Sequence, residues 1–389
     1  MKTYDTLIVG GGIIGASLAL ELSLKGQAVL LLDRQEPGRE ASWAAAGTIS
    51  PAPDAPAAAM DALSRESYRL YPGFISELES ATGKSAGFHP DGAVELFFGS
   101  DAEFERDERL KIISEAGISA VPVSLAEAAR IEPAIGPSPR AALHIRDEAN
   151  LDPRVVTRLA LNAAENAGAE IRGGTEAISL LIDDACCTGA LVSSVEETQT
   201  SARQIRAAEK IEARNVVVAA GWRSGEIRGA EAYAPTSPVR GQMVAFGPVA
   251  GAPRRILRCE RGYIAPREDG RVVAGSTLEA GKIAKYTTGG GIQKILAAAI
   301  AMTSALAEAP IVESWAGLRP DSPDHFPIIG ATDIDGLFIA TGHYRNGMLL
   351  APITAKYLSE WIVNGRGSEL LEPFTPMRFA AKPQGAAKS

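Results

Sequence analysis

The segment that most constrains this chain is a glycine-rich turn between a short apolar run and a helical pattern near the N-terminus. The apolar run covers residues 6–9, the turn reads Gly10-Gly11-Gly12-Ile13-Ile14-Gly15, and helical spacing of apolar residues follows over 16–25. A second apolar run, residues 28–32, ends at Asp33. A strand, a GxGxxG turn, a helix and a second strand in this order predict a parallel βαβ unit that binds a dinucleotide.

Each residue of this unit has an expected role. Gly10 permits the tight turn, Gly12 lets a pyrophosphate approach the backbone, and Gly15 lets the helix pack against the strand. The free N–H groups at the helix start and the positive end of the helix dipole suit a diphosphate. Asp33 is expected to accept hydrogen bonds from ribose hydroxyls. Arg34 beside it would suit a 2′-phosphate, but an acid next to a base is ambiguous, and this motif alone leaves FAD and NAD open.

A run of small residues follows the second strand. Residues 40–48 read Glu-Ala-Ser-Trp-Ala-Ala-Ala-Gly-Thr and lead toward Pro51. Small side chains in a row suit a backbone that lies against a flat ring and its ribityl chain. The alternative is an ordinary Ala-rich helix turn.

Two arginines in turns flank the last apolar strand, which we place at residues 336–342. Arg319 precedes this strand in Gly-Leu-Arg-Pro, and Arg345 follows it in Gly-His-Tyr-Arg-Asn-Gly. Either one alone is ordinarily a surface residue, but the pair predicts a clamp for a substrate carboxylate. The helix after Gly347 presents unpaired N–H groups and a positive end, which would stabilise negative charge on a flavin.

The order of the patterns predicts an α/β fold with interleaved domains. A length of 389 residues suggests two or three domains. Nucleotide-domain patterns occur at the start, in the middle and near the end, whereas residues 238–276 alternate as antiparallel strands do. We predict a Rossmann-like FAD-binding domain of residues 1–82, 145–225 and 323–375. An antiparallel-sheet α+β substrate domain would comprise residues 83–144 and 226–322, and residues 376–389 would form a mobile tail.

Charge and cysteine content argue against several classes of partner. With 39 basic and 47 acidic residues the net charge is −8, which argues against nucleic acid and anionic membranes. The three cysteines include an adjacent pair and form no CxxC, so neither a disulfide framework nor a zinc site is supported. The most apolar stretch, residues 295–306, is too short to span a bilayer. No leader-like pattern precedes the first strand, so we expect a cytoplasmic protein. The cysteine pattern gives no reason to expect a metal.

The whole chain resembles the D-amino acid oxidase superfamily of FAD-dependent amine oxidases, and within it the glycine oxidases of bacterial thiamine biosynthesis. The resemblance is carried by the glycine turn, by Ser-Trp-Ala-Ala-Ala-Gly at 42–47 and by residues 216–225. It extends to Tyr-Ile-Ala-Pro-Arg at 263–267, Gly-Leu-Arg-Pro and Gly-His-Tyr-Arg-Asn-Gly. Covalently flavinylated relatives attach FAD through a cysteine near residues 315–319. No cysteine lies there, so the resemblance implies non-covalent FAD.

The resemblance also implies the site residues. Arg319 and Arg345 would bind the substrate carboxylate, Tyr263 would line the pocket, and Leu278 would replace a methionine that faces the substrate. Trp43 stands where a small residue is usual, so Trp43 and Leu278 would reshape the pocket. No side-chain base is assigned. The residues expected to line the FAD are Gly10, Gly12, Ile13, Ile14, Gly15, Asp33, Arg34, Ala41, Ser42, Ala46, Gly47, Thr48, Ala177, Gly221, His343, Tyr344, Arg345, Asn346, Gly347, Met348 and Leu349.

The activity implied is oxidative deamination of glycine or another small amino acid or amine by a homotetramer. The products would be the 2-oxo acid, ammonia and hydrogen peroxide, with dioxygen as the acceptor. One alternative is a dehydrogenase of D-amino acids or proline that passes electrons to a quinone or protein carrier. Another is a flavin-binding subunit without turnover.

Overall fold

Two large sheets organise the computed structural model, which describes residues 3–197, 203–205 and 208–380. In the first sheet the strand order is β11-β10-β12-β1-β2-β8, with β9 beside β10, β20 beside β12 and β19 beside β20. These strands are β1 (Tyr4–Val9), β2 (Val29–Leu32), β8 (Glu170–Arg172), β9 (Thr175–Asp183), β10 (Cys186–Glu197), β11 (Arg203–Ile205), β12 (Glu209–Val218), β19 (Ile328–Ala331) and β20 (Leu337–Thr341).

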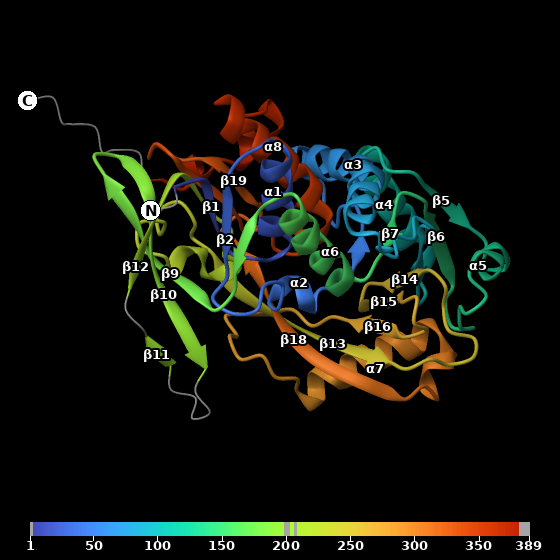
Figure 1. Ribbon diagram of the computed structural model, residues 1–389. Helices are drawn as coiled ribbons and strands as arrows, with labels where there is room; N and C mark the ends of the chain where they lie inside the picture. The colour runs from blue at the N-terminus through green and yellow to red at the C-terminus, as the bar shows by residue number, and fades with distance from the viewer. Residues whose placement is uncertain (1–2, 198–202, 206–207, 381–389) are drawn as a thin grey trace, which may run out of the picture.

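The central strands of this sheet are buried on both faces, as their continuous apolar runs predict. Strand β1 pairs in parallel with β2 and β12, and β12 pairs in parallel with β20. Ile8 points into a core shared with the helices, while Leu7 and Val9 point into a second core formed with β9 and β10. Figure 1 shows the helical layer on one side of these strands, and it consists of α1 (Ile13–Leu24), α3 (Ala58–Thr82), α6 (Pro153–Asn166) and α8 (Gly347–Asn364).

The second sheet has the order β17-β13-β16-β15-β14-β4-β6-β5, with β18 beside β13. All its pairings are antiparallel except that of β14 with β4, so the antiparallel pattern expected over residues 238–276 is confirmed. Helix α7 packs on it (Figure 1). The strands of this sheet are β4 (Ala93–Phe97), β5 (Ala120–Val123), β6 (Ala141–Ile145), β13 (Ser237–Phe246), β14 (Ile256–Cys259), β15 (Gly262–Pro266), β16 (Val272–Gly275), β17 (Glu279–Ala280) and β18 (Ile311–Asp321). The helix that packs on it, α7, covers Gly289–Met302.

Short elements join the two sheets. Helix α2 (Ala41–Ala44) contacts both α6 and β18, and β3 (Thr48–Ile49) pairs with β7 (Ala149–Asn150). Helices α4 (Ala102–Glu115) and α5 (Leu125–Ile131) lie at the β5–β6 end of the second sheet (Figure 1). The predicted domain boundaries remain a proposal.

Three further expectations concern the tail, a membrane span and a metal site. Part of the predicted tail is packed, since Arg378 donates to Asp324 at 2.8 Å, while residues 381–389 lie outside the described part of the chain. Among the described helices, none combines the length and hydrophobicity that a bilayer crossing requires. In the same residues, no group of three or more His, Cys, Asp or Glu side chains is arranged to hold a metal ion.

Candidate functional site

A cavity of about 1780 Å³ lies among the two sheets and the starts of α1 and α8, and we call it the central cavity. Nearly all the residues expected to line FAD form its wall. They are Gly10, Gly12, Ile13, Ile14, Asp33, Arg34, Ala41, Ser42, Ala46, Gly47, Thr48, Ala177, Gly221, His343, Tyr344, Arg345, Asn346, Gly347 and Met348. Arg319 and Tyr263 line the same space.

Two of the expected FAD residues stand behind this wall. Gly15 is not a wall residue, and a Cβ there would lie 1.9 Å from the carbonyl oxygen of Gly10, so only glycine allows α1 to approach β1 this closely. Leu349 is also outside the wall, because its side chain is buried in the core shared by the helices.

The nucleotide end of the central cavity carries donors that suit a dinucleotide. Helix α1 begins after Gly12 without a side-chain cap from that residue, although Ser42 Oγ accepts a hydrogen bond from Ile13 N at 2.9 Å. Asp33 accepts from Gly11 N at 2.9 Å, and burial raises the pKa of Asp33 although backbone N–H groups act against the shift. Arg34 pairs with Glu40 at 2.9 Å, yet its Nη1 is buried without a hydrogen-bond partner in the described residues. A buried donor without a partner is unfavourable, so this wall suits a ligand that is rich in hydrogen-bond acceptors.

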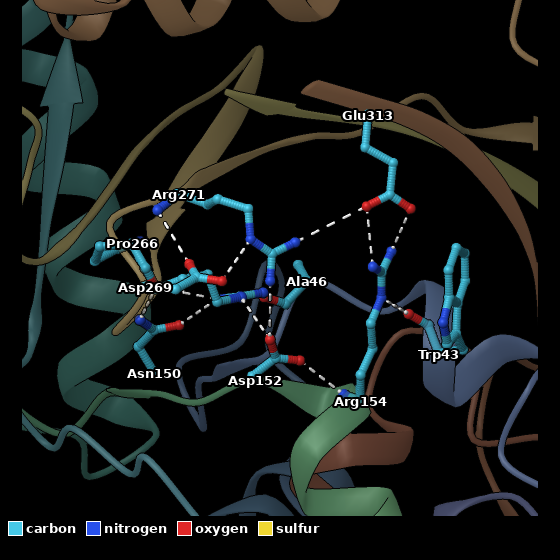
Figure 2. Close-up of polar contacts among 10 residues, drawn as sticks. Trp43, Ala46, Asn150, Asp152, Arg154, Pro266, Asp269, Arg271 and Glu313 are labelled. Atoms are coloured by element: carbon cyan, nitrogen blue, oxygen red, sulfur yellow. Dashed lines mark hydrogen bonds and ion pairs between the residues drawn. The ribbon is translucent and has the colours of Figure 1, made fainter. Parts of the chain in front are cut away.

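The small residues 41–48 form an arc of backbone along the central cavity, which we call the small-residue arc. Its carbonyl groups are held from behind by donors that are distant in sequence. Figure 2 shows Arg154 beside the backbone of Trp43 and in a bidentate pair with Glu313. The three bonds run from Arg154 Nε to Trp43 O at 3.3 Å, from Trp315 Nε1 to Ala44 O at 3.1 Å and from Arg267 Nη2 to Ala46 O.

Two residues that were expected to reshape the pocket do not form its wall. The ring of Trp43 lies 3.7 Å from the Arg154 guanidinium and meets Trp315 edge-on with centroids 6.0 Å apart. Leu278 has a side chain 61% exposed. Neither lines the central cavity, because Trp43 packs behind the small-residue arc and Leu278 faces solvent.

Arg319 is seated deep in the wall. It donates to Ser276 Oγ at 2.7 Å and to Thr277 O at 3.3 Å. The absence of a side chain at Gly241 makes room for the guanidinium, since a Cβ there would lie 2.2 Å from Arg319 Nη1. Burial lowers the pKa of Arg319, and the positive charge of Arg345 acts in the same direction, so the two arginines are close enough to repel.

Arg345 and His343 both precede α8, but they differ in burial. Arg345 is half exposed and pairs with Asp54 at 2.5 Å, so a carboxylate of the chain itself occupies this arginine. His343 is buried, its Nε2 lies 3.0 Å from Thr354 Oγ1, and burial lowers its pKa to about 3. His343 is therefore neutral and hydrogen-bonded at physiological pH.

The sequence patterns did not reveal a cluster of charged residues that also lines the central cavity. Arg258, Glu95 and Arg109 line the central cavity, and Arg109 Nε lies 3.1 and 3.2 Å from the two carboxylate oxygens of Glu95. The available signal was a charged residue inside each of two otherwise apolar strands, residues 93–97 and 256–259.

The site is a cavity for a dinucleotide cofactor, lined by a glycine turn and a small-residue arc with arginine beside them. Residues 5–361 match the family described as FAD dependent oxidoreductase (DAO), and the chain belongs to this family. The cofactor is therefore FAD, which fits the unpartnered Arg34 donor and the small-residue arc, and the protein is an FAD-dependent amine or amino-acid oxidoreductase.

The relatives narrow the type within this family. The chain is 33% identical over 367 residues to the glycine oxidase of Pseudomonas aeruginosa, covering 92% of this chain and 94% of the relative. It is 33% identical over 385 residues to the bifunctional protein ThiO/ThiG of Trichormus variabilis, covering 97% of this chain but only 55% of that longer protein. The crystal structure of glycine oxidase from Bacillus cereus superposes with a TM-score of 0.85 at 28% identity, covering 98% of this chain and 99% of that chain. The expected fold class and the glycine oxidase type are confirmed.

Proposed function

We propose that this protein oxidatively deaminates glycine or another small amino acid or amine to the 2-oxo acid, ammonia and hydrogen peroxide. The observation that carries the proposal is the partly buried Arg319 guanidinium, which lines the same cavity as the small-residue arc. Arginine binds a carboxylate through two parallel hydrogen bonds, and burial strengthens such a pair. The names of the relatives, glycine oxidase and ThiO/ThiG, support the same reaction.

The chain's own residues position the substrate. Ser276 Oγ and Thr277 O accept hydrogen bonds from Arg319, and Tyr263 is a further side-chain partner, so the guanidinium is held in position for the α-carboxylate. Arg345 adds a second positive charge once the substrate carboxylate replaces Asp54. When bound, FAD supplies the acceptor for the Cα–H hydride and passes the electrons on to dioxygen. Water then hydrolyses the imino acid.

No side chain is assigned as a base in this proposal. His343 is neutral, and its Nε2 is engaged by Thr354. An amine that binds in the neutral form needs no proton acceptor before hydride transfer, so the residues supply position and charge rather than proton transfer.

The test is peroxide release by the holoenzyme under air with glycine, sarcosine and D-alanine. Arg319→Met is expected to lower kcat/KM by about 100-fold, the size of effect seen when one partner of a buried charge pair is truncated. Arg106→Met is the matched control, because Arg106 on α4 pairs with Asp107 and does not line the central cavity.

The outcomes separate the alternatives. Bleaching of the flavin by these amines without peroxide release would favour a dehydrogenase, and no bleaching by any small amine without oxygen would favour a non-catalytic subunit. Arg319→Met with undiminished kcat/KM would contradict the carboxylate assignment. Non-covalent attachment of FAD, a homotetramer, a role in thiamine biosynthesis and a cytoplasmic location remain predictions from the resemblance.

A further inference from the structure

A row of residues in register crosses the second sheet beneath the central cavity. Met243 on β13 pairs with Gly275 on β16, and Gly275 also pairs with Tyr263 on β15. Tyr263 in turn pairs with Arg258 on β14, which pairs with Glu95 on β4. Directly opposed residues on neighbouring strands project from the same face. This row forms the floor of the central cavity. It runs from the apolar Met243 to the charged Arg258 and Glu95, with Tyr263 between them.

Arg258 is the cation of this charged end. Its Nη2 lies 2.6 Å from Glu148 Oε2, and Ser50 Oγ donates to Glu148 Oε1 at 2.7 Å. Glu148 is fully buried, and the Arg258 side chain is only 16% exposed. Burial acts to lower the pKa of Arg258, but the charges of Glu148, Glu95 and Asp54 outweigh it and the pKa is raised, so Arg258 stays positive.

One donor of Arg258 has no acceptor. The Nε–H group is buried without a hydrogen-bond partner in the described part of the chain, and arginine carries donors only. Leaving such a group unpaired is costly, so an acceptor on a ligand would gain from meeting it.

A carboxylate of the chain already bonds to an arginine of this cavity. Asp54, in the loop before α3, lies 2.5 Å from Arg345, and its charge also acts on Arg258. An anionic group in this part of the cavity is therefore within reach of the field of both arginines.

We infer that Arg258 forms a second anion subsite, which selects amine substrates that carry a second carboxylate. This inference rests on the proposed function, in which Arg319 binds the first carboxylate. The Arg258 Nε–H group would then donate to the second carboxylate, at the charged end of the floor, beyond Tyr263. The substrate class is a dicarboxylic amine, with the second acid on the nitrogen or on the side chain.

The chemistry with such a substrate is the same oxidation. With iminodiacetate, one Cα–H and the N–H hydrogen leave with two electrons and reduce dioxygen to hydrogen peroxide. Water then adds to the C=N bond and cleaves it, which releases glyoxylate and glycine. With D-aspartate the same step releases ammonia and oxaloacetate.

The first test compares acids with uncharged isosteres. Iminodiacetate is paired with N-isobutylglycine and D-aspartate with D-leucine, because each pair differs only in a carboxylate against an isopropyl group. We expect kcat/KM for peroxide release to favour the acid by about tenfold or more in one pair, which also locates the second acid. Equal or lower values for the acid in both pairs would overturn the subsite.

A binding measurement keeps the test independent of turnover. Succinate and 4-methylpentanoate form the same kind of pair without an oxidisable amine, and their Kd values follow from the absorbance change of the bound flavin. Tighter binding of succinate supports the subsite even when no amine is oxidised, an outcome that would refute only the proposed function. Equal Kd values overturn the subsite even when glycine is oxidised.

Variants assign the effect to Arg258. Arg258→Met combined with Glu148→Gln removes both charges without leaving a buried carboxylate alone, and should reduce the preference for the acid about 10- to 100-fold. Arg258→Lys keeps a cation beside Glu148 but lacks the Nε–H group, and should reduce the preference for the acid as well. The matched control, Arg106→Met with Asp107→Asn, removes an arginine–carboxylate pair that does not line the central cavity and should keep the preference. A purely structural Arg258 would lower the melting temperature and weaken both members of each pair equally.

Discussion

Arg267 offers the sharpest test of how the small-residue arc is held. Its side chain is 5% exposed and donates to Ala46 O, to Asn150 Oδ1 at 3.0 Å and to Pro266 O at 3.1 Å. Burial lowers the pKa of Arg267 to about 10, so it remains charged at neutral pH. Arg267→Met keeps much of the volume but leaves the acceptors and the nearby Asp152 carboxylate without this donor.

The expected size follows from those contacts. A buried acceptor without its donor costs about 1–3 kcal/mol. Two such acceptors, Ala46 O and Asn150 Oδ1, predict a loss of about 2–6 kcal/mol in the free energy of unfolding. Ala46 belongs to the arc that lines the central cavity, where we propose that FAD binds. We therefore expect the Kd for FAD to rise about tenfold or more, which is about 1.4 kcal/mol.

The assay is titration of the apoprotein with FAD, followed by quenching of flavin fluorescence, together with thermal unfolding with and without FAD. FAD should raise the melting temperature of the variant less than that of the wild type, since stabilisation by a ligand depends on its Kd. Arg271→Met is the control, because Arg271 lies in the same network near Asp152, Asp269 and Glu313 but does not contact the arc (Figure 2). A variant that melts earlier but binds FAD with the wild-type Kd would refute the reasoning.

Four further predictions test single features of the site. Asp54→Asn removes the exposed ion pair of Arg345 and should tighten glycine binding roughly two- to fivefold, measured by flavin absorbance titration. Unchanged binding would show that Asp54 does not compete with the substrate carboxylate for Arg345. Burial lowers the pKa of His343 to about 3 from 6.5, so the unfolded chain binds more protons between these values and stability falls as the pH drops through this range. His343→Gln should flatten that slope, by at most about 1.4 kcal/mol per pH unit in urea unfolding, and an unchanged slope would contradict the assignment. Leu278→Ala should change kcat/KM less than about twofold because the side chain faces solvent, and a larger effect would place it at the substrate. Gly15→Ala should yield protein without bound flavin, since its Cβ would meet Gly10 O at 1.9 Å, and a yellow, stable variant would be inconsistent with that contact.

Local patterns were enough to predict the nucleotide half of the site. The glycine turn, the strand before it and the helix after it are contiguous, so hydrophobic spacing and the conformational needs of glycine specify them together. The start of α6 could also be predicted from neighbouring residues. Asp152 caps the helix by accepting a hydrogen bond from Arg154 N at 2.9 Å, and Pro153 occupies the first helical position. These interactions span a few residues, so the sequence contains both partners side by side.

The residues that the sequence reasoning misplaced or missed depend on pairing between distant strands. Trp43 was expected to reshape the pocket because the family resemblance places it where a small residue is usual, but it packs against Arg154 and Trp315 behind the arc. Arg258 appears in the sequence as one charged residue in an apolar run. Only the register between β14 and β15 sets it beside Tyr263.

The sequence by itself determined the class of cofactor, the βαβ unit and the presence of two arginines near the last strand. Arg345 lies in a turn as expected, but Arg319, which was also expected in a turn, lies within β18 opposite Val239. The tertiary structure alone decided which side chains face the central cavity, that Gly241 leaves room for Arg319, and that Asp54 meets Arg345 across the cavity. The physical reason is that backbone conformation responds to neighbours along the chain, whereas the direction and partners of a buried charge are set by strands and loops that meet only after folding.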